Sequence, residues 1–265
     1  MNHSVKLEMA AASDVGLVRT HNEDSVAFST GVGPDGEPDC GIAILADGMG
    51  GYNAGEVASA MATDIVHRVL QDQLQRQWAS GQIASIASVR AWLTDAIGAA
   101  NAAILQAGQQ EPQYRGMGTT IVVALLLGGM LTLAHVGDSR GYRYRAGRLE
   151  QLTRDHSLLQ EQIDAGLIDP ANAQFYQHKN IITRAVGVDD QVQVETHDYP
   201  IEAGDIYVLC SDGLSDMLTA AQIGAILQRY TGKADLDGAC QTLIVEANAH
   251  GGHDNVSVIV VRVQA

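Results

Sequence analysis

Four aspartates in this chain share one local pattern, in which the carboxylate stands at the edge of an apolar run beside Gly, Ser or Asn. They are Asp47 in LADGMGG, Asp138 in AHVGDSR, Asp212 in VLCSDGLSD and Asp254 in HDNVSVIVV. A fifth acidic group, Glu23-Asp24, ends the polar loop that begins near Ser13. Turns and helix caps explain any single aspartate of this kind, but they explain the shared pattern poorly.

If the strand ends that carry these residues converge, several carboxylates meet in one pocket. Such a density of negative charge cannot stay ionised without a partner, because each carboxylate raises the pKa of its neighbours. A hard divalent cation, Mg²⁺ or Mn²⁺, relieves the repulsion through oxygen ligands and retained waters. The pattern therefore predicts a divalent-metal site built from carboxylates.

Arg19 adds a different chemistry, because it lies four residues before Glu23. A guanidinium at this position can hold a tetrahedral oxyanion through two parallel hydrogen bonds beside the metals. Taken alone, an arginine here is more typical of a solvated surface charge, and the residues by themselves leave both interpretations open.

The element expected to hold Asp47 is a buried strand over 42–46, because this run is short, apolar and bounded by turn residues. Asp47 would then stand at the strand end. Gly48, Gly50 and Gly51 would let the backbone come close to whatever Asp47 binds. A long helix over about 54–76 is expected next, with apolar residues at helical spacing.

The order of the other elements predicts the fold class. Further strands are expected at 5–13, 25–29, 118–127, 130–137, 140–146, 149–152, 192–199, 205–210 and 255–263. Further helices are expected at 85–108, 157–165, 220–230 and 234–249. Because helices come in consecutive pairs and strands in consecutive hairpins, we predict an α+β fold of antiparallel sheets with helices on their outer faces. We expect one domain over residues 1–265, with a mobile surface insertion at about 166–177.

Charge and composition exclude several classes of partner. The chain has 265 residues, with 16 Lys and Arg against 31 Asp and Glu, for a net charge of −15. This balance argues against nucleic acid or an anionic membrane as partner. The uncharged stretch 116–137 is long enough to span a bilayer, but Gly128-Gly129 divides it and favours a buried hairpin. The basic run Arg140–Arg148 is interpreted as a solvated strand face, with docking of acidic phosphopeptides as the alternative.

The cysteines and the N-terminus indicate a cellular compartment. Three cysteines lie far apart without CxxC spacing, and the N-terminus has no apolar signal core. We therefore expect reduced thiols, no zinc site and a cytoplasmic location.

Seven ordered blocks carry a resemblance that runs over nearly the whole chain. They are SDVGLVRTHNED, ILADGMGG, GMGTTIVVALL, AHVGDSRGYRYRAGRLEQLTRDHS, ITRAVG, VLCSDGLSD and HDNVSVIVV. The chain resembles the metal-dependent protein phosphatases of the PP2C class, in particular the bacterial serine/threonine phosphatases. This resemblance implies a four-layer α-β-β-α sandwich, in which two antiparallel sheets are flanked by pairs of antiparallel helices.

The resemblance also implies a role for each residue of the site. Asp47 would bridge two Mn²⁺ or Mg²⁺ ions, with Glu23 and the Gly48 carbonyl on one ion and Asp212 and Asp254 on the other. Asp138 would help Asp212 to hold a third, weaker ion, so that two to three ions bind in all. Arg19 would bind the substrate phosphate, and Asp24 and Asn255 would orient ligands or waters.

The implied activity is hydrolysis of phosphoserine and phosphothreonine in proteins by a water that bridges the two ions. The expected partners are phosphorylated proteins in a pathway that includes a serine/threonine kinase, and the expected state is a monomer. No cysteine is followed by arginine at the spacing of a cysteine phosphatase loop, and no P-loop lysine motif or HExxH motif is present. The alternative is a non-catalytic phosphoprotein-binding regulator on the same fold.

The proton donor to the leaving group is not assigned by the sequence. Met49 and Tyr52 stand where relatives carry histidine. His156 can serve in principle, although a helix-capping turn is the preferred interpretation of Asp155-His156-Ser157. Residues 157–185 correspond to a flap beside the site, which we expect to bear on substrate choice.

Overall fold

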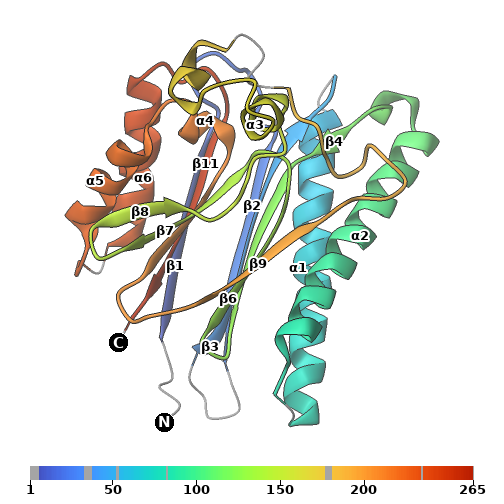
Figure 1. The fold of residues 1–265 in the computed structure, drawn as a ribbon. Helices are drawn as coiled ribbons and strands as arrows, with labels where there is room; N and C mark the ends of the chain where they lie inside the picture. The colour runs from blue at the N-terminus through green and yellow to red at the C-terminus, as the bar shows by residue number, and fades with distance from the viewer. Residues whose placement is uncertain are drawn as a thin grey trace.

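The protein is a sandwich of two antiparallel sheets with helices on both outer faces (Figure 1). The computed structural model describes residues 6–32, 38–51, 54–81, 83–176, 181–233 and 235–264. This architecture confirms the predicted α+β, four-layer α-β-β-α sandwich. Strand β1 (Leu7–Asp14) begins and β11 (Val256–Val263) ends at the same end of the sandwich in Figure 1, opposite the end that carries α3 and α4.

Each sheet is built entirely from antiparallel neighbours. The first sheet has the order β1 (Leu7–Asp14), β11 (Val256–Val263), β10 (Ile206–Cys210), β7 (Arg140–Arg145) and β8 (Arg148–Gln151). The second has the order β2 (Asp24–Val32), β3 (Pro38–Met49), β5 (Ile121–Leu127), β6 (Met130–Val136) and β9 (Glu195–Pro200). A short β4 (Gly118–Thr119) pairs with the end of β3.

The helices cover the two outer faces in pairs. The second sheet is covered by α1 (Ala54–Ser80) and α2 (Ile86–Gln110), and the first by α5 (Ala220–Tyr230) and α6 (Leu236–Ala249). The remaining helical elements are α3 (Leu158–Asp164), α4 (Asp212–Ser215) and the 3₁₀ turns η1 (Pro112–Tyr114) and η2 (Pro170–Phe175).

Alternation along the strands produces three apolar layers. On β3, Ile42 and Ile44 pack against α1 and α2, whereas Ala43 and Leu45 pack between the two sheets. On β11, Val258 and Val260 face α5 and α6, while Ile259 and Val261 face the other sheet. Because both faces of β3 and β5 are buried, residues 42–46 of β3 and 121–127 of β5 are apolar without interruption.

The structure differs from the sequence expectations at β3, at β9 and in the predicted insertion, among other places. The strand around Ile42 is longer than predicted, so Asp47 lies inside β3 and not at its end. Gly48 and Met49 continue the strand because β4 pairs with them, and that pairing comes from a distant segment with no local signal. The strand predicted at 192–199 begins at Glu195, and the predicted insertion contains the 3₁₀ turn η2.

The uncharged stretch 116–137 forms a buried hairpin, as predicted. Strands β5 and β6 pair along their full length, and Gly128 and Gly129 form the turn with φ angles of 59° and 79°. Such positive φ values favour glycine, which has no Cβ to clash. Across the described part of the chain, every helix is too short or too polar to cross a bilayer.

Candidate metal centre

The predicted acidic residues come from both sheets and lie at the ends of neighbouring elements. Asp24 and Asp47 are on β2 and β3, where they are direct cross-strand partners. Asp138 follows β6, Asp212 begins α4 directly after β10, and Asp254 lies two residues before β11. The helix α4, which starts at Asp212, marks this end of the sandwich in Figure 1.

The carboxylates are close enough to control one another's protonation. Burial raises the pKa of Asp47 well above its usual range, and the charges of Asp24, Asp212, Asp138 and Asp254 raise it further. Burial and the charge of Asp138 raise the pKa of Asp212 to about 8. The sequence prediction that these carboxylates meet in one site is therefore supported by their electrostatics.

Asp138 and Glu23 lie in the same electrostatic environment. Burial, followed by the charge of Asp155, raises the pKa of Asp138 to about 6. Burial also raises the pKa of Glu23, and the charge of Arg19 opposes that shift. All the side-chain atoms that these acids offer are oxygens, which is the donor set that Mg²⁺ and Mn²⁺ prefer.

Asp24 is held between the two sheets. Its Oδ2 accepts a hydrogen bond of 2.9 Å from Ser211 Oγ, and Ser211 Oγ accepts one of 3.0 Å from the Ser257 amide. The other oxygen, Oδ1, is buried and has no hydrogen-bond partner among the described residues. Burial raises the pKa of Asp24 to about 6. An unpartnered buried carboxylate oxygen beside Asp47 fits a group that supports a cation or its waters.

Asn255 fixes the loop that carries Arg19 and Glu23. Its Oδ1 accepts a 2.8 Å hydrogen bond from the Glu23 amide, and its Nδ2 donates to the carbonyls of Val15 and His21 at 3.0 and 2.9 Å. One buried amide therefore satisfies three backbone groups of this loop, which fits the predicted orienting role.

Two glycines allow α1 to begin directly against the site. A Cβ on Gly48 would lie 2.1 Å from the Gly55 carbonyl oxygen, and a Cβ on Gly55 would lie 2.9 Å from Glu23 Oε1. The Gly48 amide also donates to the Glu23 carbonyl at 3.1 Å. Gly51, by contrast, lies in open space. Close approach of β3, α1 and Glu23 therefore requires glycine at 48 and 55, and the sequence interpretation did not assign a role to Gly55.

Arg19 lies at the exposed rim of the acidic cluster. Its Nη2 donates to Asp254 Oδ2 at 2.8 Å, and the side chains of Arg19 and Asp254 are 52% and 35% exposed. The hydrogen bond to Asp254, together with its charge, raises the pKa of Arg19, and Glu23 and Asp47 add to this effect. The guanidinium is thus beside the predicted metal ligands and accessible to an anion from solvent.

His156 is turned away from this cluster. Its Nδ1 accepts a 3.1 Å hydrogen bond from the Gly137 amide, and its Nε2 lies 3.2 Å from Glu195 Oε2. Ser157 caps α3, accepting a hydrogen bond from the Gln160 amide through its hydroxyl. Met49 is partly buried at the end of β3, and Tyr52 lies outside the described residues. A protein proton donor to the leaving group is therefore not identified.

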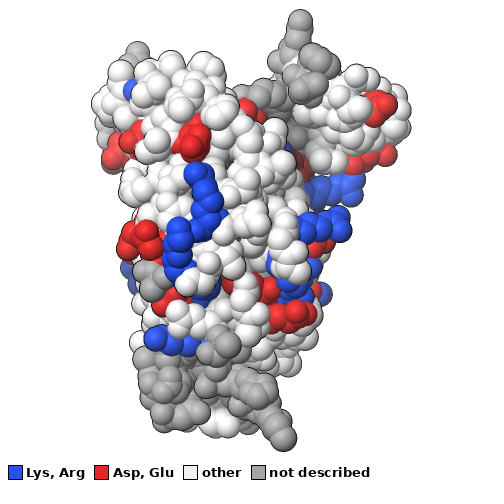
Figure 2. All heavy atoms as spheres, turned by 90° about the vertical axis from the view of Figure 1, so that its left-hand side faces the viewer, with Lys and Arg blue, Asp and Glu red and all other residues white. Residues whose placement is uncertain are grey.

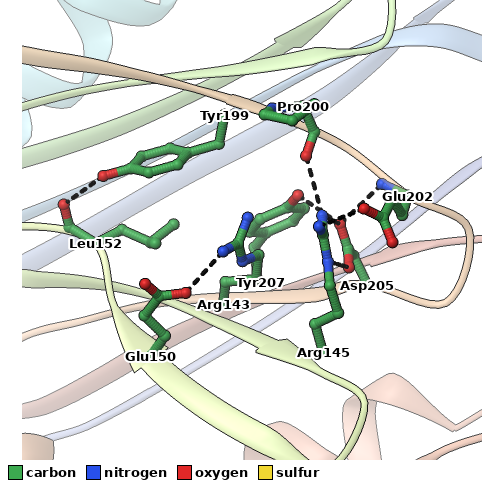
Figure 3. Close-up of polar contacts among 9 residues, drawn as sticks. All are labelled: Arg143, Arg145, Glu150, Leu152, Tyr199, Pro200, Glu202, Asp205 and Tyr207. Atoms are coloured by element: carbon green, nitrogen blue, oxygen red, sulfur yellow. Dashed lines mark hydrogen bonds and ion pairs between the residues drawn. The ribbon is translucent and has the colours of Figure 1, made fainter.

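The basic run of β7 and β8 is not a solvated strand face, contrary to the sequence interpretation. Arg140 pairs with Asp155, Arg143 with Glu150, and Arg145 with Asp205 and Glu202. Figure 3 shows Arg145 also reaching the Pro200 carbonyl at 3.0 Å, so that this side chain joins β7 to β9 of the other sheet. On the face shown in Figure 2, positive side chains lie beside negative ones. The three paired arginines stabilise the fold and are not free to attract a polyanion.

The sequence interpretation missed several residues that position the site. Thr120 accepts a 3.1 Å hydrogen bond from the Asp47 amide through Oγ1, which also lies 2.7 Å from Ser139 Oγ. Thr119 Oγ1 donates to the Asp47 carbonyl at 2.8 Å. The two neighbouring threonines of the GMGTT block were the only sequence signal for this role. Their contact with Asp47 follows from the pairing of β3 with β4 and β5.

The comparisons with known proteins agree with this geometry. The family model described as Protein phosphatase 2C matches residues 18–243. The protein phosphatase PhpP of Streptococcus pneumoniae is 38% identical over 255 residues, covering 96% of this chain and 97% of the relative. The crystal structure of the Mycobacterium tuberculosis serine/threonine phosphatase PstP/Ppp has a TM-score of 0.83 at 37% identity, covering 98% of this chain and 100% of that one.

A second solved structure bears on the metal ions. The catalytic domain of the serine/threonine protein phosphatase PstP, in complex with two manganese ions, has a TM-score of 0.81 at 37% identity. It covers 98% of this chain and 100% of that chain. The fold and the carboxylate cluster together define an enzyme of the phosphatase class. The chain belongs to the protein phosphatase 2C family.

Proposed function

We propose that this protein hydrolyses phosphoserine and phosphothreonine in proteins, using two to three Mn²⁺ or Mg²⁺ ions held by its carboxylates. The observation that carries the proposal is the convergence of Asp47 with Asp24, Asp138, Asp212 and Asp254, each close enough to raise the pKa of Asp47. Such a cluster binds either protons or cations at neutral pH. Divalent cations are the group that matches its all-oxygen donors.

Each acidic residue has a proposed place in the centre. Asp47 would serve two ions, with Glu23 and the Gly48 carbonyl at one of them and Asp212 and Asp254 at the other. Asp138 would join Asp212 at a third ion. When bound, the ions lower the pKa of a water that attacks phosphorus, and they neutralise charge on the phosphoryl oxygens.

Arg19 binds the substrate phosphate in this proposal. The guanidinium already pairs with a carboxylate oxygen of Asp254 at the rim, and a phosphate offers oxygens of the same geometry. The guanidinium is half exposed, so an incoming phosphate can reach it from solvent. Asp24 and Asn255 keep the Glu23 loop and β3 in place, through the contacts to Ser211 and to the Glu23 amide.

The attacking group is water and not a protein side chain. Cys40, Cys210 and Cys240 are all buried, and burial raises the pKa of Cys210 and Cys240 to about 12. A buried thiol with a raised pKa is not a nucleophile at neutral pH. We infer that the cysteines fill the apolar layers and take no part in the reaction.

The biological setting follows as a proposal of the same kind. The substrates are phosphorylated proteins, and the enzyme opposes a serine/threonine kinase. Residues 1–265 act as one phosphatase domain in the cytoplasm, as a monomer, and the segment 157–185 contributes to substrate choice. The alternative, a non-catalytic regulator that binds phosphoproteins, has less support because Glu23, Asp47, Asp212 and Asp254 are all present.

The test is release of phosphate from a phosphothreonine peptide as a function of Mn²⁺. Activity is expected to require the metal and to disappear with EDTA. Asp47→Asn is expected to lower kcat/KM by at least about 1,000-fold, because the bridging position cannot be replaced by a neutral amide. The matched control is Asp72→Asn on the exposed face of α1, which should behave as wild type. Full activity of Asp47→Asn, or full activity in EDTA, would reject the proposal.

A further inference from the structure

A second group of possible metal ligands is linked to the carboxylate cluster through Gly137, which precedes Asp138 and whose amide donates to His156 Nδ1. His135 on β6, His156 before α3 and Glu195 at the start of β9 each offer one ligand atom, and these atoms all lie within 4.8 Å of one another. Among the described residues, no other three histidine, cysteine or acidic side chains place their ligand atoms this close together. The group shares no residue with the acidic cluster. Both imidazoles are buried, with exposed fractions of 0% for His135 and 6% for His156.

His135 is prepared to bind a cation. Its Nε2 lies 2.9 Å from the Arg154 carbonyl, which only accepts hydrogen bonds, so Nε2 carries the proton and Nδ1 keeps its lone pair. This Nδ1 is buried and has no hydrogen-bond partner among the described residues. A histidine that binds a metal usually donates its other N–H to a carbonyl or carboxylate, as His135 does. An unpartnered buried imidazole nitrogen is costly unless a ligand satisfies it.

The net charges of these three groups also suit a cation. Burial lowers the pKa of His135 and of His156, so both rings are neutral at pH 7. Glu195 is partly buried, which acts to raise its pKa, but hydrogen bonds from His197 and His156 lower it overall. Two neutral imidazoles and one carboxylate form the donor set of many Zn²⁺ sites.

We propose that His135, His156 and Glu195 form a second metal site that selects a borderline-soft divalent ion of the zinc type. The two nitrogen donors distinguish this site from the all-oxygen cluster, which prefers Mg²⁺ or Mn²⁺. The ligands are His135 Nδ1, His156 Nε2 and a Glu195 carboxylate oxygen, and the remaining positions belong to water. His197 Nε2, 2.6 Å from Glu195 Oε1, holds that carboxylate in place.

Filling this site has a consequence for the nearby phosphatase centre. In the structure the Gly137 amide donates to His156 Nδ1, so the neutral ring carries its proton on Nε2 and donates to Glu195. Binding through Nε2 moves that proton to Nδ1, which then opposes the Gly137 amide and breaks its hydrogen bond. Gly137 directly precedes Asp138, so an ion in the histidine site loosens the segment that carries a carboxylate of the main centre.

Substitution of Arg184 provides a test, because the proposal predicts that metal affinity rises when the positive charge is removed. Its Nη1 lies 3.3 Å from His156 Nε2, and its charge lowers the pKa of His156. A positive charge at this distance opposes a divalent cation in the same place. Removing the charge should therefore strengthen binding, whereas a substitution that only disturbed the structure would weaken it.

The experiment measures Zn²⁺ affinity and stoichiometry with a competing chromophoric chelator. It uses the full chain carrying Asp47→Asn and Asp212→Asn, which disable the carboxylate cluster. One Zn²⁺ per chain is expected. Affinity should fall at least tenfold with Glu195→Gln, rise severalfold with Arg184→Gln, and stay unchanged with His67→Gln, a control on α1. His135 is fully buried, so its substitution could disturb folding. The test therefore relies on Glu195→Gln, because Glu195 is partly exposed and glutamine has the same shape.

Three results would overturn the site. They are the absence of Zn²⁺ binding in the chain with the disabled cluster, an unchanged affinity in Glu195→Gln, and a weakened affinity in Arg184→Gln. The coupling to Asp138 rests on the proposed phosphatase function, and it is read separately as Zn²⁺ inhibition of the wild type at saturating Mn²⁺. Binding without any such inhibition supports the site and rejects the coupling. Failure of phosphatase activity leaves the binding result untouched.

Discussion

Asp24 and Asp47 face each other directly across β2 and β3. Like charges in opposed positions destabilise a sheet, so this pair is costly for folding unless a cation, as proposed, offsets the repulsion. Ser211 and Thr120 show how the cost is limited, because the hydroxyl of Ser211 donates to Asp24 and that of Thr120 accepts from the Asp47 amide. At the scale of single residues, the site is a set of acids whose hydrogen bonds fix their positions but do not neutralise their charge.

Arg19 provides the prediction that belongs to this scale. Arg19→Ala should raise KM for a phosphopeptide and lower kcat/KM roughly 10- to 100-fold, the effect expected for losing charge-assisted hydrogen bonds to a phosphate. Its ion pair with Asp254 is largely exposed, so the free energy of unfolding should change by less than about 1 kcal/mol. Steady-state kinetics and urea unfolding measure the two effects. Arg68→Ala on α1 is the control, and a large loss of stability with unchanged KM in Arg19→Ala would contradict the phosphate role.

The beginning of α1 determines the shape of the site at the scale of elements. This helix packs so closely on β3 that a Cβ on Gly55 would lie 2.8 Å from the Gly48 carbonyl carbon. The Glu23 carbonyl accepts hydrogen bonds from the Gly48 amide and from Ser59 Oγ at 3.1 and 2.6 Å, so β2, β3 and α1 meet at one point. The geometry of Glu23 therefore depends on three elements that are joined there.

Gly55→Ala tests this packing. The new methyl group would push against Gly48 and Glu23, at a cost of about 1–3 kcal/mol, and would displace the Glu23 carboxylate. The Mn²⁺ concentration for half-maximal activity should rise several-fold, which a metal titration measures. Gly98→Ala on α2 is the matched control, because a Cβ there meets no atom within 4 Å. It should stabilise the protein by about 1 kcal/mol through helix propensity and leave the metal dependence unchanged.

Over the whole molecule, the acidic cluster gathers like charges from both sheets at one end of the sandwich. Arg145 has the opposite effect, because it pairs with buried Asp205 and reaches the Pro200 carbonyl on the other sheet. The hydrogen bond from Arg145 helps to lower the pKa of Asp205, although burial acts to raise it. The paired charges of Arg145 and Asp205 thus hold the sheets together, whereas the clustered carboxylates repel one another unless cations, as proposed, offset their charge.

The stability of the metal-free protein should therefore depend on pH in an unusual direction. The pKa values of Asp24 and Asp138, about 6, and of Asp212, about 8, lie above the values of an unfolded chain. The folded state keeps protons that the unfolded state has lost, so its stability falls as the pH rises through this range. In EDTA, Tm should decrease between about pH 6 and pH 9. Excess Mg²⁺ should make this decrease in Tm smaller, and so should Asp212→Asn. A Tm that rises over this pH range in EDTA would contradict the raised pKa values of the carboxylates.

Much of the fold could be predicted from the sequence because the signals are local. Apolar runs such as Ile42–Ala46 and the turn at Gly128-Gly129 reflect burial and backbone conformation within a few residues. The acids at the edges of these runs predicted a metal site for the same reason. To predict that these acids form one site, it is enough that the strand ends meet, and a two-sheet sandwich brings them together.

Contacts between distant segments were decided only by the tertiary structure. The pairing of β4 with Gly48, the ion pair of Arg19 with Asp254, and the internal pairing of Arg145 each join residues far apart in sequence. The close group of His135, His156 and Glu195 also depends on the register of β6 with β9 and on the return of the chain after β8. Register and packing angle are properties of pairs of elements, so no local pattern in either partner records them. The sequence determined which side chains carry chemistry, and the tertiary structure decided which of them meet.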